Sequence, residues 1–169
     1  MRRALVIFLT SFLLWALVAQ VNDALAGWRV YLSVGGLFVV YAALTLPLRD
    51  GLVATFLAGL LCDAAAPVAF GTQAILFVTA HTVLFHLRDR LPRDETVSRV
   101  LLALLANLAF FLAISFVEVT RSPSPAAAWR RLLADLVCSQ LFLALVAPWF
   151  FALQTRALEF APARRDEIG

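Results

Sequence analysis

Six long apolar runs divide this sequence, and their length is what most constrains its fold. The runs cover about residues 4–25, 30–48, 52–66, 72–91, 97–117 and 132–153. Most of them approach the roughly 20 residues that a helix needs to cross a hydrocarbon core ~30 Å thick. The polar intervals between them are too short for a separate soluble domain. The sequence therefore predicts an all-α polytopic membrane protein, in which residues 1–169 form one domain, a bundle of six transmembrane helices.

The composition and the placement of the charges agree with this interpretation. The chain is 63% hydrophobic and 15% charged, whereas soluble domains are roughly half apolar and a quarter charged. With six spans and the N-terminus inside, ten of the fourteen arginines lie on the cytoplasmic side and four outside. The inner set is Arg2, Arg3, Arg49, Arg88, Arg90, Arg93, Arg99, Arg156, Arg164 and Arg165; the outer set is Arg29, Arg121, Arg130 and Arg131. The positive-inside rule thus places both termini in the cytoplasm. No basic patch with interleaved aromatics indicates nucleic-acid binding.

The N-terminal 26 residues resemble a signal peptide, because Met-Arg-Arg precedes an apolar stretch that ends at Ala24-Leu25-Ala26. The apolar stretch is longer than the usual core of such a signal. We therefore expect it to stay attached as the first span.

The stretch 46–71 contains the features that most need explanation. On a helix, small residues and one acid recur every four positions along one face, namely Gly51, Thr55, Gly59 and Asp63, with Ala54, Ala58 and Cys62 in an adjacent row. In lipid, small residues let helix backbones approach closely, and an acid among them faces protein or a wet cavity. Pro47 should end the preceding span, residues 49–51 should form a tight turn, and Pro67 should break the helix before the outer surface.

Asp63 has two interpretations from its position alone. Its carboxylate could accept backbone N–H groups from the turn between Pro67 and Gly71, or it could bind a polar group of a partner. Asp63 and Asp135 on separate helices could also imitate the two aspartates of an intramembrane aspartyl protease. The chain has neither the Tyr-Asp nor the Gly-x-Gly-Asp context of that class. We expect no catalytic residue, no cofactor and no metal, and hence no enzyme.

Other polar residues are expected in the interior of the bundle. They are Gln73, His81, Asn107 and Asp135. Asn107 lies in the middle of the fifth run and should make a hydrogen bond between helices. His81 and His86 are five residues apart, about 140° around a helix, so one helix cannot offer both to one metal ion.

The stretch 46–71 resembles the signature of a known protein family. A Leu-Pro and Arg turn, a helix that reads Gly59-Leu60-Leu61-x-Asp63, and Gly71 opening the next span resemble the MreD family of bacterial rod shape-determining membrane proteins. The chain length, the six-span layout and the inside termini match as well. Pro47, Gly59, Asp63 and Gly71 carry the pattern. Between the acid and the second glycine the family often has serine and glycine, whereas this chain has Ala64-Ala65-Ala66-Pro67-Val68-Ala69-Phe70.

The resemblance implies a non-enzymatic scaffold subunit of the cell-elongation machinery in the bacterial inner membrane. It implies binding to an MreC-type protein and, through it, to MreB, RodA and a penicillin-binding transpeptidase. It also implies a fold similar to the substrate-binding subunits of energy-coupling-factor transporters. The two small-residue rows of the 51–63 helix are the expected docking face for the partner's helix.

The alternative is a vitamin-binding transporter subunit of that same fold. It would need an outward-facing pocket where polar side chains from several helices converge. The candidates are Asn22, Asp63, Gln73, Glu118 and Asp135.

Overall fold

The computed structural model describes residues 2–65, 69–90, 95–121 and 125–159, and within these residues it contains six α-helices and no strand. The helices are α1 (Arg2–Leu25), α2 (Gly35–Thr45), α3 (Leu48–Asp63), α4 (Thr72–Leu87), α5 (Thr96–Arg121) and α6 (Pro125–Glu159), with short 3-10 helices η1 (Ala26–Trp28) and η2 (Arg88–Arg90). Each α-helix overlaps one of the six apolar runs. The prediction of an all-helical chain is therefore confirmed for the described residues.

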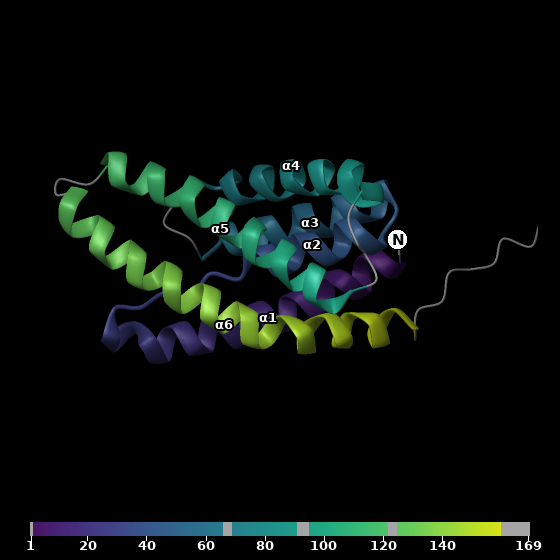
Figure 1. Ribbon diagram of the computed structural model, residues 1–169, viewed down its shortest axis with the longest axis horizontal. Coiled ribbons are helices and arrows are strands. Elements are labelled where there is room, and N and C mark those ends of the chain that lie inside the picture. Colours follow the sequence, from purple (N-terminus) through teal and green to yellow (C-terminus); the bar gives the residue numbers. More distant parts are fainter. Residues whose placement is uncertain (1, 66–68, 91–94, 122–124, 160–169) are drawn as a thin grey trace, which may run out of the picture.

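Helix α2 forms the core of the bundle. Ten of its eleven residues, Gly35 to Leu44, are buried, and it contacts α3, α4, α5 and α6. The other helices surround it: α1 packs on α3 and α6, α3 on α4, and α5 on α6 (Figure 1). A helix that is apolar on every side can be buried in this way because it has no polar face to present to water.

Successive helices run in alternating directions, so the connections gather at two ends of the bundle. The start of α1 and the end of α6 lie at the same end (Figure 1). This arginine-rich end contains Arg2, Arg3, Arg49, Arg88, Arg90, Arg99 and Arg156. The opposite end, called the distal end below, contains residues 26–34, the end of α3 and the start of α4, with Arg29, Arg130 and Arg131. The segregation of arginines expected from the sequence is thus present in the fold.

Three helical segments of the described chain are long and apolar enough to cross a membrane, by length and composition: Arg2–Trp28, Thr96–Val117 and Trp129–Glu159. Their outward faces carry exposed leucines, for example Leu9 on α1, Leu105 on α5 and Leu141 on α6. Such faces suit contact with acyl chains, and the chain is a membrane protein. α3 and α4 have sixteen residues each, or about 24 Å of helix.

Several helix boundaries differ from the prediction. α2 starts at Gly35 rather than near residue 30, because residues 30–34 form a non-helical segment. α3 starts at Leu48, so residues 49–51 lie in its first turn and do not form a separate turn. Pro47 is the N-cap of α3 and Leu46 before it is extended, as predicted for a residue before proline.

The remaining prolines lie in the connections between helices and in the last helix. Pro67, expected to break a helix, lies outside the described residues, as does Pro92. The interval between the fifth and sixth apolar runs, residues 118–131, is largely helical in its described part, since α5 includes Arg121 and α6 starts at Pro125. Proline suits the first turn of a helix, where its missing N–H has no partner to lose. α6 continues through Pro148 and changes direction along its length (Figure 1).

Candidate functional site

Asp63, the last residue of α3, holds the start of α4. Its side chain is 3% exposed. Asp63 Oδ2 accepts hydrogen bonds from the backbone N–H groups of Gly71 at 3.0 Å and Ala74 at 3.1 Å, and Oδ1 accepts one from Gln73 N–H at 2.9 Å. The first N–H groups of a helix have no partner within the helix, and a carboxylate there also complements the helix dipole. The predicted turn-fixing role of Asp63 is confirmed, with donors in the first turn of α4 as well as in the connection.

Gly71 completes this turn. It is the N-cap of α4 and has φ +95°, in the left-handed region that only glycine enters without strain. Gly71, Gly59 and Asp63, which the sequence singled out as parts of one signature, thus belong to one α3–α4 hairpin.

The small-residue face of α3 is filled by α4. Gly51, Thr55, Gly59 and Asp63 are all buried, as their spacing predicted. A Cβ on Gly59 would collide with Ala74 Cα and lie 2.8 Å from Ala74 N, and a Cβ on Gly51 would collide with the imidazole of His81. The neighbouring Ala54 and Ala58 are each 2% exposed. The face is therefore closed by the chain's own helices, which corrects the expectation that it receives a helix of a partner.

The non-helical segment 30–34 is held by side chains from α1 and α6. Asn22 of α1 accepts a hydrogen bond from Leu32 N–H at 2.8 Å and donates one to Leu32 O at 3.1 Å. Asp135 of α6 accepts one from Tyr31 N–H at 3.0 Å. Ser139 of α6 accepts one from Ser33 N–H at 2.9 Å. These bonds supply partners for backbone groups that no helix pairs, which buried non-helical backbone requires.

Asp135 and Asp63 therefore do not form a pair. Asp135 faces the 30–34 segment and lies 3.9 Å from Arg131 Nε, whereas Asp63 faces the α3–α4 connection. Each carboxylate accepts hydrogen bonds from backbone N–H groups, and the two do not face each other. The arrangement therefore gives no support to the protease interpretation.

Asn107 of α5 makes the predicted hydrogen bond between helices. Its Oδ1 accepts a hydrogen bond from Gly36 N–H at 3.3 Å, at the start of α2. A Cβ on Gly36 would collide with the carbonyl oxygen of Ala103 and lie 2.7 Å from Asn107 N. α2 and α5 consequently touch backbone to backbone at this point.

The two histidines of α4 lie in different surroundings. His81 is fully buried, against Gly51 and stacked on Phe85, and neither ring nitrogen has a hydrogen-bond partner among the described residues. His86 is exposed, with Nδ1 2.7 Å from Thr82 O. Within the described part of the chain, no group of three His, Cys, Asp or Glu side chains could hold a metal ion.

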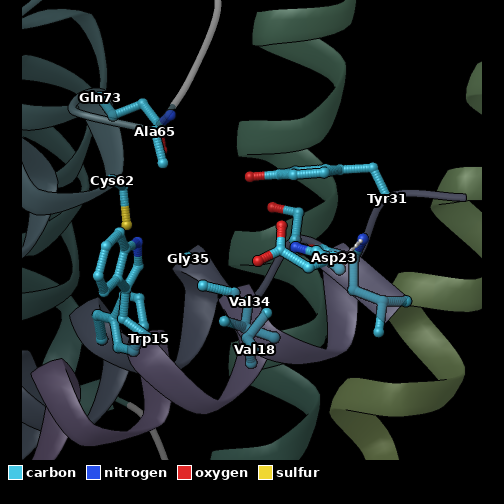
Figure 2. A pocket seen from close by; sticks show the side chains of 14 residues that line it. Trp15, Val18, Asp23, Tyr31, Val34, Gly35, Cys62, Ala65 and Gln73 are labelled. Carbon is cyan, nitrogen blue, oxygen red and sulfur yellow. Dashed lines mark hydrogen bonds between the residues drawn. The ribbon is translucent and has the colours of Figure 1, made fainter. Parts of the chain in front are cut away.

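A cavity of about 160 Å³ lies at the distal end, between α1, the 30–34 segment, α2 and the α3–α4 hairpin. Figure 2 shows Trp15 and Cys62 on one side of it, with Gln73 and Ala65 beyond them, and Tyr31 and Asp23 on the opposite side. Asn22 and Phe38 also line it. We call it the distal cavity.

Of the residues that the sequence named as candidates for an outward-facing pocket, Asn22 and Gln73 line this cavity. Gln73 was expected in the polar interior, and it lines the cavity while its backbone N–H binds Asp63. Trp15, Asp23 and Tyr31 were not candidates. Trp15 and Gln73 lie on α1 and α4, and no local pattern indicates that two such distant residues line one space. The side chain of Glu118 lies outside the described part of the structure.

Comparison with known protein families, with curated proteins and with solved structures found no match for this chain.

Proposed function

We propose that the chain is a non-enzymatic scaffold subunit of the MreD type in the bacterial cell-elongation complex. It crosses the inner membrane six times with both termini in the cytoplasm, and it binds an MreC-type partner within the membrane. Through this partner it would support the MreB filament, RodA and a penicillin-binding transpeptidase, and thereby rod shape and peptidoglycan synthesis.

The observation that carries this proposal is the construction of the α3–α4 hairpin. The resemblance rests on Pro47, Gly59, Asp63 and Gly71. In the structure, Pro47 caps α3, Gly59 lies against the backbone of Ala74, and Asp63 binds the N–H of Gly71. The residues that resemble the family signature thus all shape the α3–α4 hairpin. A signature that maintains a fold, and not a catalytic site, is expected of a scaffold protein, and this supports the proposal.

The partner must then bind outside the α3–α4 interface. The outward rows of α1, α5 and α6 carry large apolar side chains: Leu9 is 53% exposed, Leu105 61% and Leu141 68%. In lipid, helices associate through packing and hydrogen bonds, so a close-fitting apolar row can receive another transmembrane helix.

Co-purification tests this function and locates the docking face. The tagged chain should recover from its native membranes a protein with one transmembrane helix and a periplasmic domain, encoded by a neighbouring gene. Leu9→Trp, Leu105→Trp and Leu141→Trp each place a larger side chain on the outward face of one helix, α1, α5 or α6, and leave the core unchanged. We expect one of them to reduce recovery of the partner at least about tenfold while the chain elutes as a folded monodisperse species.

Depletion of the chain supplies the second measurement, since cells that lose a rod-complex scaffold should become round. Retention of rod shape on depletion, together with failure to recover any single-span partner, would contradict the proposed function.

The alternative of a vitamin-binding transporter subunit is less well supported. Of its candidate residues, Asn22, Asp63 and Asp135 bind backbone groups of the chain itself. The distal cavity, about 160 Å³, is smaller than the roughly 300–1,000 Å³ of pockets that enclose drug-sized ligands. A thermal shift with a vitamin would favour this alternative.

A further inference from the structure

The distal cavity has a rigid frame. One of its walls, the 30–34 segment, is fixed by the hydrogen bonds of Asn22, Asp135 and Ser139. Another, the α3–α4 hairpin with Cys62 and Gln73, is fixed by Asp63. A space enclosed by fixed walls is preformed, and a ligand that enters it does not have to order the protein first.

The lining includes polar side chains that take no part in these networks, among them Asp23 and Gln73. The Asn22 carboxamide is occupied by the backbone of Leu32. The Asp23 carboxylate and the Gln73 carboxamide, in contrast, have no hydrogen-bond partner among the described residues. They lie on opposite sides of the cavity (Figure 2). A ligand between them could interact with both.

The charge and the rings of the lining indicate the class of ligand. Among the described residues of the lining, Asp23 alone is charged at neutral pH, so this lining favours a cation. Trp15 and Tyr31 face the same space (Figure 2), and the faces of such rings attract ammonium groups, with tryptophan the strongest. A carboxylate with aromatic walls is the arrangement that recognises an organic ammonium group.

The size of the cavity limits the ligand to one small group. An apolar cavity of about 150 Å³ in another protein holds one benzene molecule, and the distal cavity has about 160 Å³. It therefore has room for one trimethylammonium or aminoethyl group, with the rest of the molecule outside the cavity.

We propose that the distal cavity binds the ammonium group of a small organic cation, with Asp23 as the counter-ion and Trp15 and Tyr31 as the aromatic wall. The ammonium group could belong to a free amine or to the headgroup of a phospholipid in the outer leaflet. This site is independent of the proposed scaffold function, because it requires no partner protein.

Tryptophan fluorescence of the purified chain tests the site. Replacing the exposed Trp28, Trp129 and Trp149 with phenylalanine leaves Trp15 as the only emitter. Choline titrated into this protein in detergent should change the Trp15 emission saturably. Asp23→Asn should weaken the apparent affinity at least about tenfold, the effect of losing a charged partner. The matched variant Asp89→Asn, exposed at the arginine-rich end, should leave the affinity unchanged.

Two further measurements test the role of the ligand's charge and distinguish a free amine from a lipid headgroup. The neutral isostere 3,3-dimethylbutan-1-ol should bind at least about tenfold more weakly than choline. In nanodiscs, an Asp23-dependent difference in Trp15 emission between phosphatidylethanolamine and phosphatidylglycerol, without a response to choline, would identify the lipid headgroup as the ligand.

The proposal is overturned by any of three results with folded protein. These are no response to either source, equal binding of choline and its neutral isostere, or equal binding by the Asp23→Asn variant. Circular dichroism and size-exclusion elution establish that each variant is folded.

Discussion

At the scale of single residues, four polar side chains bind backbone groups at places where helices begin or are interrupted. Asp63 binds the start of α4, Asn107 the start of α2, and Asn22 and Asp135 the non-helical segment before α2. Each of these places has backbone groups that no helix satisfies, and in lipid an unsatisfied group costs several kcal/mol.

The sequence could predict the role of Asp63 but not that of Asp135. The donors to Asp63 lie eight to eleven residues along the chain, within one hairpin. The donor to Asp135 lies 104 residues away. The 30–34 segment is itself largely apolar, so its pattern favours helix, and only the distant side chains that hold it make the extended backbone stable.

Removal of the Asp63 carboxylate should destabilise the α3–α4 hairpin. Asp63→Ala leaves the N–H groups of Gly71, Gln73 and Ala74 without their acceptor, and we expect a loss of about 2–3 kcal/mol in the free energy of unfolding. Asp63→Asn, which keeps one acceptor oxygen, should lose about 1–2 kcal/mol. Unfolding by SDS in mixed micelles measures both.

Asp23→Ala is the matched control for this prediction. Asp23 lies at the same end of the bundle but is exposed, so its change should stay within about 0.5 kcal/mol. Equal stabilities of the Asp63→Ala and Asp23→Ala variants would show that the hydrogen bonds of Asp63 contribute nothing net.

At the scale of elements, the sequence predicted a close-packing face on α3 but not the helix that fills it. Small residues every four positions show that some backbone approaches closely. They carry no information on whether that backbone belongs to the same chain. The occupant is α4, which follows in sequence and returns antiparallel along α3, so the shortest connection supplies the neighbour.

Adding a single methyl group to Gly59 should therefore reduce stability. A Cβ there meets backbone atoms of Ala74, including N at 2.8 Å, and backbone cannot move aside as a flexible side chain can. We expect Gly59→Ala to lower the free energy of unfolding by about 1–3 kcal/mol, measured by unfolding in SDS, and Gly59→Leu to prevent normal folding.

Gly27 provides the matched control. Nothing lies within 4 Å of an added Cβ there, so Gly27→Ala should be near neutral in the same unfolding assay. A stable Gly59→Leu variant that fails only in partner binding would restore the docking interpretation of this face.

At the scale of the whole molecule, the apolar runs predicted the number and order of the helices, because that information is contained in the lengths of the runs. They did not predict that α2 would be only eleven residues long and central. Burial of α2 depends on how the four helices that contact it, α3, α4, α5 and α6, arrange themselves around it. Gly36 allows α5 to approach, and Gly35 lies against the ring of Phe77 on α4, yet a glycine pair within an apolar run does not reveal which helices will approach.

The orientation of the bundle can be tested by cysteine labelling. The arginines gather at the end where α1 starts and α6 ends (Figure 1), and the positive-inside rule places that end in the cytoplasm. With Cys62 and Cys138 replaced by alanine, single cysteines are introduced as Gly27→Cys at the distal end and Glu95→Cys at the arginine-rich end, both at exposed positions. A membrane-impermeant maleimide should label Gly27→Cys in intact spheroplasts and should label Glu95→Cys only after lysis. The reverse pattern would invert the molecule and place the distal cavity in the cytoplasm, whereas labelling of both before lysis would mean an even number of crossings, or none, between residues 27 and 95. The expected pattern requires an odd number of crossings there, as the proposed six-span layout has if α2, α3 and α4 each cross once.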